Sequence, residues 1–444
     1  MDLGAEVSRR TMLKGSAATA AALALPINRL LGYSAVAKGT EGGTVTLGVD
    51  DDAAGVAGVA KALIPFTKKT GIKVNVFSEA GASDTWVSVF QTISTRLAAG
   101  EPLDTAIIAT EGMLLFENKG VLEPLDSYIA ADKAVVQNFY NDINPQLLAR
   151  YRALDAPHGH TYFMPLGYNV MGIWFNRELF KQLNIAEPAP DWTWDDFESI
   201  AAKIADPPNR YGYSIYTPPS PFTDVYPWVL TAGGEIMNPA QTKCVANNPG
   251  AIQAAEFVVG LIKKQLVNAP GGSYNPFTEA PGGKLGMLGA GIWPNISFGL
   301  PQKTINSQFA IVPWPQMPKP ATPVGLGGLG IFKSSKNKAA TWELIKYTMS
   351  EEFQADYQVA VAGGMPMRQS IARSKEFLSQ YPPGTENFSN ELTYSTMIVG
   401  VPNGSAVENE IGVAWEQILT GATSPAAGLE AMETTCNQLM AQQV

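Results

Sequence analysis

The sequence has few of the residues that usually build metal centres and nucleophilic sites. Its 444 residues include only two cysteines, Cys244 and Cys436, and two histidines, His158 and His160. A His-x-His pair alone is not a convincing zinc site, and Ser-His-Asp or Cys-His nucleophiles need a third partner for which the sequence offers little support. We therefore expect no metal ion, no cofactor and no catalytic residues.

Long apolar runs are also absent. The Ala-rich run at residues 16–26 is too short to span a bilayer as an ordinary helix, which needs about 20 residues. It follows Arg9 and Arg10 and precedes a small-residue site at Ala35-Val36-Ala37. This order is typical of a twin-arginine signal, which exports folded proteins across a bacterial plasma membrane.

We expect residues 1–37 to be this signal and the protein to reach the periplasm or the outer face of the plasma membrane. No cysteine occurs in the first 243 residues, so attachment of a lipid at the end of the signal is not expected. Whether the signal is removed or kept as an anchor stays open. Because the destination is oxidising, Cys244 and Cys436 are predicted to form a disulfide, with two buried free thiols as the alternative.

Basic side chains are fewer than acidic ones. Without residues 1–37 the chain keeps 27 basic and 38 acidic side chains, a net charge near −11. This balance argues against nucleic acid or an anionic membrane surface as partner, and it mildly favours neutral or cationic ligands.

The pattern of elements predicts an α/β fold. Strand-like segments at 44–49, 73–77 and 105–109 alternate with helical stretches, which indicates a largely parallel, open sheet. Thr193 and Asp196 form a predicted capping box at the start of a helix. Further helices are predicted at 249–264, 338–349 and 407–419, and two α/β lobes fit the whole pattern better than one.

Several segments together resemble the family-1 extracellular solute-binding proteins of ABC importers, which include maltose and glycerol-3-phosphate binding proteins. Residues 159–179 resemble the strand that crosses between lobes in that family. Trp-Thr-Trp-Asp-Asp-Phe at 192–197 resembles its helix start, and residues 283–293 its cleft segment that ends in Trp. Residues 309–315 and 325–332 resemble its second crossover and the glycine-rich strand that follows. The resemblance extends from about Thr44 to Val444.

The resemblance implies a two-lobed periplasmic-binding-protein fold of type II, with interrupted lobes joined by hinge crossovers. One lobe is expected at 44–165 plus 310–365 and the other at 166–309 plus 366–444. It also implies a monomer that closes by hinge motion around a solute and then docks on permease subunits.

Ligand-binding candidates lie where strands end, because open sheets bind ligands at the carboxyl ends of their strands. A sugar site pairs carboxylates, amides or guanidinium groups with flat aromatic rings. Carboxylates at strand ends are one group of candidates, and the family resemblance adds cleft aromatics, an asparagine, two glycines and a crossover arginine. The predicted binding residues are Asp50, Asp51, Glu79, Trp86, Glu111, Asn169, Trp228, Trp293, Gly327, Gly328 and Arg368.

Two other motifs are weaker than they look. Asp50 and Asp52 have the first spacings of a calcium loop, but its glycine and distal glutamate do not follow. Gly325, Gly327 and Gly330 satisfy G-x-G-x-x-G, yet no helix follows at once, as a dinucleotide site requires.

The sequence therefore predicts a non-enzymatic subunit of an ABC importer that binds a neutral or amino sugar, or an oligosaccharide. A glycerophosphodiester or glycerol-phosphate ligand is one alternative, although residues 393–404 contain no Arg or Lys to meet a phosphate. An exported polysaccharide-degrading enzyme that uses two cleft carboxylates is the other.

Overall fold

The structure is a computed structural model that describes residues 43–50, 53–80, 86–155, 159–268, 270–271, 274–361, 363–398 and 400–442. The predicted signal, Asp51 and His158 lie outside these residues. Among the described helices, none is both long and apolar enough to cross a membrane.

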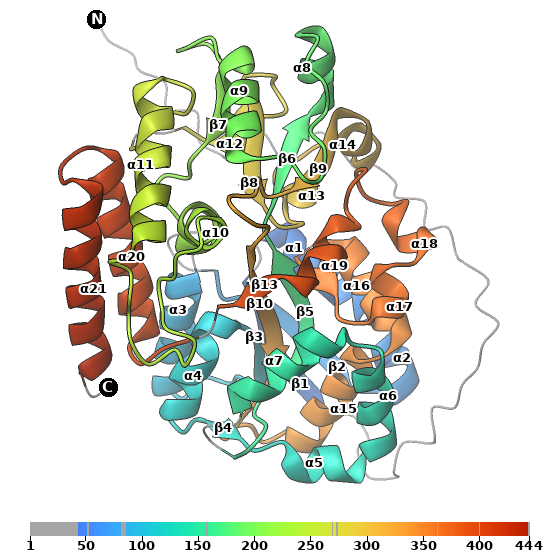
Figure 1. Ribbon diagram of the computed structural model, residues 1–444. Helices are drawn as coiled ribbons and strands as arrows, with labels where there is room; N and C mark the ends of the chain where they lie inside the picture. Colours follow the sequence, from blue (N-terminus) through green and yellow to red (C-terminus); the bar gives the residue numbers. More distant parts are fainter. Residues whose placement is uncertain are drawn as a thin grey trace, which may run out of the picture. The chain divides into compact units, whose positions relative to one another are not determined.

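A seven-stranded sheet and a four-stranded sheet organise the chain (Figure 1). The large sheet has the order β12-β5-β10-β3-β1-β2, and β13 also pairs with β10. Its strands are β1 (Thr44–Val49), β2 (Lys73–Ser78), β3 (Thr105–Ala109), β5 (Met164–Val170), β10 (Thr322–Leu329), β12 (Met365–Pro366) and β13 (Ser395–Met397). The small sheet consists of β7 (Tyr211–Ser214), β8 (Leu285–Ala290), β6 (Gly172–Asn176) and β9 (Phe309–Pro313), in that order. A further pair joins β4 (Leu122–Glu123) to β11 (Ile331–Phe332).

Helices connect and cover these strands. Before residue 210 they are α1 (Ala53–Ala62), α2 (Ile64–Thr70), α3 (Trp86–Ala98), α4 (Thr110–Asn118), α5 (Asp126–Ala131), α6 (Lys133–Asn141), α7 (Pro145–Asp155), α8 (Arg177–Gln182) and α9 (Trp194–Ile204). From residue 221 to 308 they are a π-helical turn η2 (Pro221–Val225), α10 (Tyr226–Thr231), α11 (Pro249–Lys263), α12 (Pro276–Glu279), α13 (Pro294–Ser297) and α14 (Gln302–Gln308). The remainder are α15 (Lys338–Thr348), α16 (Glu351–Val361), α17 (Gln369–Ala372), α18 (Lys375–Leu378), α19 (Asn387–Asn390), a 3₁₀ turn η3 (Glu391–Thr393), α20 (Gly404–Leu419) and α21 (Pro425–Ala441).

The large sheet is parallel only in its first part. β1 pairs in parallel with β2 and β3, as the alternating pattern predicts, whereas β10 is antiparallel to both β3 and β5. All five residues of β3 are buried, because neighbouring elements cover both faces of the sheet. The α/β class is therefore confirmed, with a mixed sheet in place of a largely parallel one.

The chain passes between the two sheets a few residues later than the predicted lobe boundaries. β5 stays in the large sheet up to Val170, and β9 stays in the small sheet up to Pro313. The chain thus changes sheet at residues 170–172 and again at 313–322. The lobe division given above stays a prediction.

Local sequence signals account for several helix ends. Thr193 accepts a hydrogen bond from Asp196 N at 3.2 Å, and the Asp196 carboxylate accepts one from Thr193 N at 2.9 Å. This is the predicted capping box of α9. α11 and α21 begin with Asn-Pro and Ser-Pro, in which the first side chain caps the helix and proline fills the first turn.

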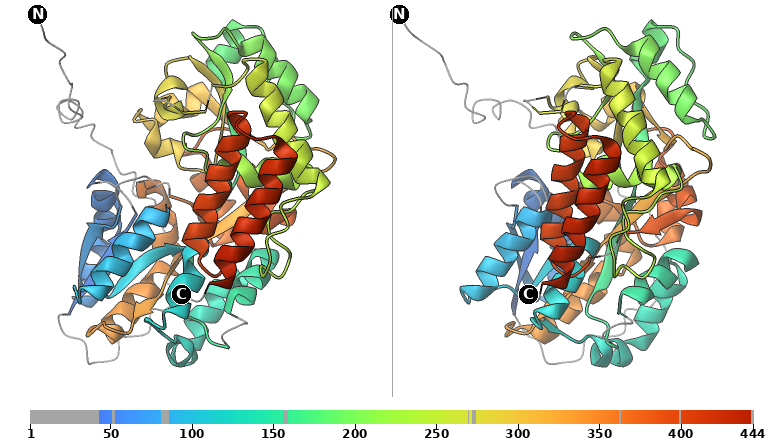
Figure 2. Two further views of the ribbon diagram at one scale, coloured as in Figure 1. Left: turned by 90° about the vertical axis from the view of Figure 1, so that its left-hand side faces the viewer. Right: turned by 60° about the vertical axis from the view of Figure 1, so that its left-hand side comes forward.

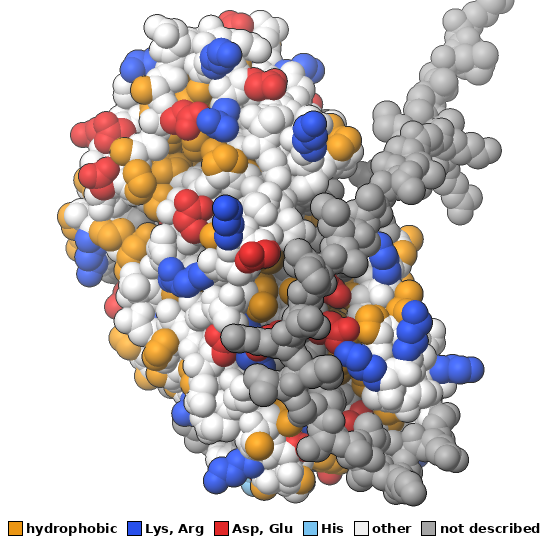
Figure 3. All heavy atoms as spheres, turned by 90° about the vertical axis from the view of Figure 1, so that its right-hand side faces the viewer, with side chains coloured by type: hydrophobic (Ala, Val, Ile, Leu, Met, Phe, Trp, Pro, Cys, Tyr) orange, Lys and Arg blue, Asp and Glu red, His pale blue; other side chains and the backbone are white. Residues whose placement is uncertain are grey.

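Apolar residues alternate across the small sheet. On β6, Trp174 packs into one buried cluster and Ile173 into the other, and neither is exposed. The second cluster is closed by α20 and α21, which contact one another and α11 (Figures 1 and 2). On the surface, Figure 3 shows acidic and basic side chains interspersed on one face, with apolar side chains between them.

The turn before α19 packs directly on β9 at Gly384. Its φ is +90°, and a Cβ there would lie 1.8 Å from Ile311 O. Gly421, after α20, has a φ of +77°, but a Cβ there would have no other atom within 4 Å. The two glycines therefore share the backbone requirement and differ in the space around them.

We predict that Gly384→Ala lowers the free energy of unfolding by about 3 kcal/mol or more, because the turn must leave the strand. Gly421→Ala, the matched control, should cost only about 1 kcal/mol, the backbone term. Urea unfolding of both variants measures the difference. Equal losses would show that the contact with Ile311 is unimportant.

Candidate functional site

Two predicted carboxylates lie at the same edge of the large sheet. Asp50 follows β1 and Glu111 lies in the first turn of α4, directly after β3, and β1 and β3 are parallel neighbours. Desolvation raises the pKa of Asp50 to about 6, although its side chain still reaches solvent. A carboxylate that is crowded by protein yet open to water is typical of the wall of a cleft.

Glu79, the third strand-end carboxylate, is in the interior and is not a ligand group in this structure. It is fully buried, and its Oε1 lies 2.9 Å from Nε of Arg96. Its side chain packs on Gly48, where a Cβ would meet Glu79 Cγ at 2.7 Å. Desolvation raises the pKa of Glu79 to about 7 despite the charge of Arg96. The strand-end pattern located its loop correctly but did not show which way the side chain turns.

Glu111 lines a pocket together with two residues that the sequence did not single out. Glu408, from α20, and Tyr226, the first residue of α10, complete its polar wall. The wall is otherwise apolar and includes Ile398, Val401 and other aliphatic side chains. α20 also contacts α3 and α4, which follow strands of the large sheet, and α11 and α21 on its other side. The pocket therefore forms where the C-terminal helix pair meets the end of the large sheet.

Periodicity alone could not have selected Glu408. It lies between Val407 and Ile411, whose buried positions place it at the border of the apolar face of α20. A carboxylate at such a border is usually solvated, so the signal appears only once α4 is known to face it.

The asparagine of the crossover strand holds two other segments in place. Asn169 Nδ2 donates to Gly363 O at 2.8 Å, and Asn169 Oδ1 accepts from Ile292 N at 3.3 Å. Gly291 leaves room for this contact, since a Cβ there would lie 2.5 Å from both Asn169 Oδ1 and the Trp293 ring. Asn169 thus fixes the segment that carries Trp293.

The predicted aromatics separate into two environments. Trp293 is half-buried and packs against both main apolar clusters, so one part of its ring remains available. Trp86 is also half-buried and stacks on Phe90 at 5.7 Å.

Trp228 is a core residue and not a cleft aromatic. Only 1% of it is exposed, and rings surround it, including Trp314 at 4.9 Å and Phe197 at 5.1 Å. The family resemblance predicted a cleft position for it, but its ring turns inward, while Tyr226 of the same helix lines the pocket.

The glycine-rich strand presents one face to the site. A Cβ at Gly325 would meet Phe222 and Thr110 Oγ1, both at 3.4 Å. η2, which carries Phe222, therefore reaches the strand end where α4 begins. Gly327, two residues on, shares this face and is partly exposed, while Gly328 follows a register shift and packs on Met113. Of the two predicted glycines, only Gly327 remains accessible to a ligand.

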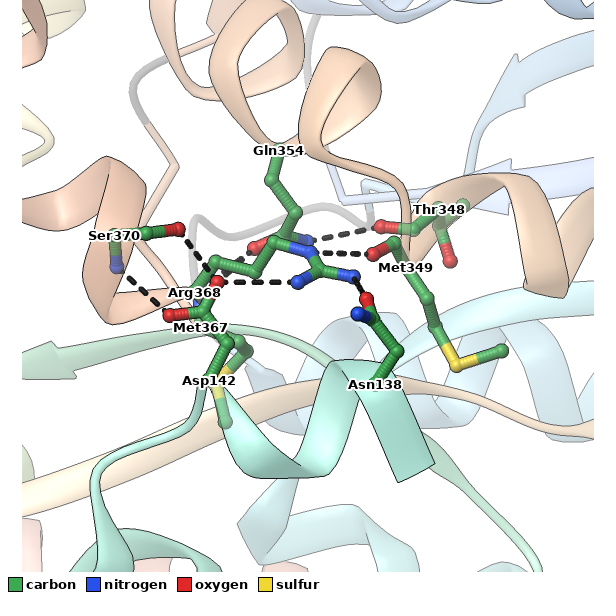
Figure 4. A network of polar contacts seen from close by, with 8 residues as sticks. All are labelled: Asn138, Asp142, Thr348, Met349, Gln354, Met367, Arg368 and Ser370. Carbon is green, nitrogen blue, oxygen red and sulfur yellow. Dashed lines mark hydrogen bonds and ion pairs between the residues drawn. The ribbon is translucent and has the colours of Figure 1, made fainter. Parts of the chain in front are cut away.

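Arg368 points into the protein and away from a ligand, because it is buried and each of its three guanidinium nitrogens donates to a neighbouring residue (Figure 4). Nε donates to Met349 O at 2.8 Å, and the two terminal nitrogens donate to Asp142 Oδ2 at 3.1 Å and Asn138 Oδ1 at 2.9 Å. The ring of Phe139 lies 5.3 Å from the guanidinium carbon. Arg368 thus clamps the third crossover onto α6 and α15, which is a structural role rather than a binding role.

The two cysteines are free and buried, in contrast to the predicted disulfide. The neighbouring Cys436 thiol lowers the pKa of Cys244, whereas the Cys244 thiol together with burial raises the pKa of Cys436. Asn437 adds two hydrogen bonds to the backbone of Cys244, both of 2.9 Å. The pair is adjacent, so a bridge in the exported protein stays a prediction.

No group of three or more His, Cys, Asp or Glu side chains that could hold a metal occurs in the described ranges. His160 instead pairs with Asp126 at 3.0 Å on the surface.

Comparison with known proteins identifies the family. Residues 61–382 match the bacterial extracellular solute-binding proteins, and residues 6–26 match the twin-arginine translocation pathway signal sequence. The chain therefore belongs to the bacterial extracellular solute-binding protein family, and the export signal predicted from Arg9 and Arg10 is confirmed.

Relatives and solved structures agree on the fold. The chain is 25% identical over 309 residues to a binding protein of Brucella abortus, covering 66% of this chain and 69% of the relative. A structure of an ABC substrate-binding protein of Listeria monocytogenes in complex with cycloalternan superposes with a TM-score of 0.76 at 22% identity, covering 91% of this chain and all of the other. An ABC transporter solute-binding protein of Thermotoga lettingae bound with α-D-tagatose superposes with a TM-score of 0.73 at 21% identity, covering 90% and 100%. The fold is thus the two-lobed, type II fold of periplasmic binding proteins.

We predict that Arg368→Ala lowers the free energy of unfolding by about 3 kcal/mol, because it removes the cationic partner of the largely buried Asp142 carboxylate. Arg177→Ala is the control: its pair with Glu187 is exposed, so it should cost less than about 1 kcal/mol. Ligand selectivity should be unchanged in Arg368→Ala at temperatures where it remains folded. A selective loss of ligand affinity at unchanged stability would return Arg368 to the binding site.

We also predict that the exported protein, denatured without reductant, has no titratable thiol, since export leads to an oxidising compartment. Cys244→Ser/Cys436→Ser protein serves as the blank, and the reduced wild type as the two-thiol reference. Two thiols per chain in the unreduced sample would establish the free pair instead.

Proposed function

We propose that the protein is the substrate-binding subunit of an ABC importer, which captures a carbohydrate between its lobes and delivers it unchanged to the permease. The observation that carries this is the meeting of Phe222, Thr110 and Gly325, which joins an aromatic segment to the strand ends that bear Asp50 and Glu111. Carboxylate acceptors beside aromatic faces suit the hydroxyl groups and C–H faces of a sugar.

Three features support this reading over an enzyme. Family membership, the export signal and the sugar complexes of the two superposed structures all fit a carrier of solutes. Glu79 is withdrawn into the core, which removes one carboxylate from any acid–base pair. We propose accordingly that the protein catalyses no reaction, acts as a monomer, and is anchored by no lipid.

Binding at the interface of two lobes couples capture to closure. A ligand that contacts both lobes favours the closed form by its differential affinity for that form, and the permease can then recognise it. The proposed lobes are those of the sequence prediction, with Asp50 and Glu111 on one and Trp293 and Glu408 on the other.

A thermal-shift screen of mature protein against mono-, di- and oligosaccharides and glycerophosphodiesters tests the function. A ligand at 100 times its Kd should stabilise the fold by about 2.7 kcal/mol. The sugar should also be recovered intact after long incubation. Conversion of the sugar by purified protein would overturn the proposal, as would stabilisation by phosphodiesters only.

We predict that Trp293→Ala weakens binding of the sugar found in that screen about fivefold, because a stacked ring contributes about 1 kcal/mol. Trp293→Phe, which keeps a ring, should retain most of the affinity. Isothermal titration calorimetry measures both. Unchanged affinity in Trp293→Ala would remove this ring from the site.

A further inference from the structure

The pocket between α4, α10 and α20 brings together two carboxylates with no basic partner. Glu111 and Glu408 are both mostly buried, and no Lys, Arg or His is among the residues that line the pocket. The sequence from residue 376 to the C-terminus contains no basic side chain at all. Two carboxylates in one enclosed site repel each other unless a proton or a cation lies between them.

The pKa values of the two carboxylates reflect this burial and repulsion. Burial raises the pKa of Glu111 to about 7, and burial together with the charge of Glu111 raises the pKa of Glu408 well above its usual range. The other titratable groups near the pair are Tyr226 of α10 and, behind it, Cys244 and Cys436. None of these carries a positive charge, so nothing in the pocket lowers the pKa of either carboxylate by charge attraction.

Tyr226 adds a third polar group to the pocket. It is 7% exposed, lines the pocket and feels the charges of both Glu408 and Glu111. None of the hydrogen bonds among the described residues involves its hydroxyl, so this group is free to bond a ligand that enters the pocket.

The pocket is already shaped. The loop before α20 is fixed on α4, because Gly400 N donates to Thr110 O at 3.0 Å and a Cβ at Gly400 would lie 2.6 Å from Glu111 O. The pocket has room for about one water-sized group. The NH₃⁺ head of an alkylammonium group has this size and carries three N–H donors, as many as the site has polar side chains.

We propose that Glu111, Glu408 and Tyr226 form a subsite for a primary ammonium group, so that the captured ligand is a basic, amino-bearing sugar. This rests on the proposed function for the sugar part alone. Each N–H meets one acceptor, and the aliphatic wall keeps water away from these charge-assisted hydrogen bonds. A calcium ion fits less well, because it takes six to eight oxygen ligands.

A neutral sugar hydroxyl in the same place gains less. It can donate only one hydrogen bond, and one carboxylate must stay protonated beside it. The ammonium group allows both carboxylates to ionise, which displaces the shared proton. Binding of an amine should therefore release a proton near neutral pH and weaken as the pH falls below about 7, while binding of a neutral sugar should not.

Calorimetry with matched probes tests the subsite: glucosamine against glucose, galactosamine against galactose, and ethanolamine against ethylene glycol. At pH 8 we expect at least a tenfold preference for the amine in the pair that binds best. Titration in buffers of different ionisation enthalpy should show proton release at pH 7 for the amine only.

Two variants and one control locate the effect. Glu408→Gln is isosteric and removes one charge. The preference for the amine should therefore fall to less than twofold, and the proton release should fall to near zero. Tyr226→Phe should weaken the amine severalfold without changing the proton release. Glu416→Gln, two turns further along α20 and outside the pocket, should behave as wild type.

The outcomes separate this proposal from the proposed function. Neutral sugars bound as well as amines, with Glu408→Gln unchanged, would overturn the subsite and leave carbohydrate capture intact. Ethanolamine bound in a Glu408-dependent way, with no sugar bound, would support the subsite and overturn the carbohydrate. Amine preference that survives Glu408→Gln, or no binding by any probe, would overturn the subsite.

Discussion

The chain passes from the large sheet to the small sheet at Met171. The whole architecture depends on making that passage without leaving backbone N–H and C=O groups unpaired. One side chain achieves this. The fully buried Thr322 hydroxyl accepts from Met171 N at 3.0 Å and donates to Met171 O at 2.9 Å. Thr322 is the first residue of β10, the strand with which the chain enters the large sheet again after the small sheet. The two crossings are thereby joined at a single point, which suits a hinge because few bonds define the axis.

The third crossing is secured by a second polar group. Gln354 of α16 is fully buried, donates to Leu166 O and Thr348 O, and accepts from Met367 N at 2.8 Å. It therefore ties β5 to the segment that carries Arg368. Side chains that hydrogen-bond to several crossing segments at once make the large sheet rigid. The ligand-facing loops can then vary in chemistry.

Much of this could be predicted because it is local. The capping box at Thr193, the helix that begins at Pro249 and the strand at 105–109 each depend on a few consecutive residues, and the structure confirms them. The order of strand, crossover and glycine-rich segments was enough to indicate the two-lobed fold. The strand ends at Asp50 and Glu111 followed from the same logic, since parallel neighbours end at one edge.

Side-chain direction could not be predicted in the same way. Trp228 and Tyr226 are two residues apart on one short helix, yet the first lies among core rings and the second in the pocket. Glu79 was expected in the cleft because it follows a strand end, and Arg368 because it lies at a crossover of the resembled family. Both have partners from distant segments, Arg96 and Asp142, and no sequence pattern indicates a partner so far along the chain.

The inward turn of Arg368 changes the electrostatics of the cleft. As the one cation expected there, it would have offset part of the charge of Asp50 and Glu111. In the structure its charge is paired with Asp142, and α20 adds Glu408 on the opposite wall. Burial raises the pKa of Asp50 and Glu111, and burial together with the charge of Glu111 raises the pKa of Glu408. Such a site destabilises the free protein, and the destabilisation is smallest when a ligand brings the missing positive charge. The negative net charge of the exported chain and the geometry of the pocket thus point in the same direction, toward a cationic ligand rather than an anionic one.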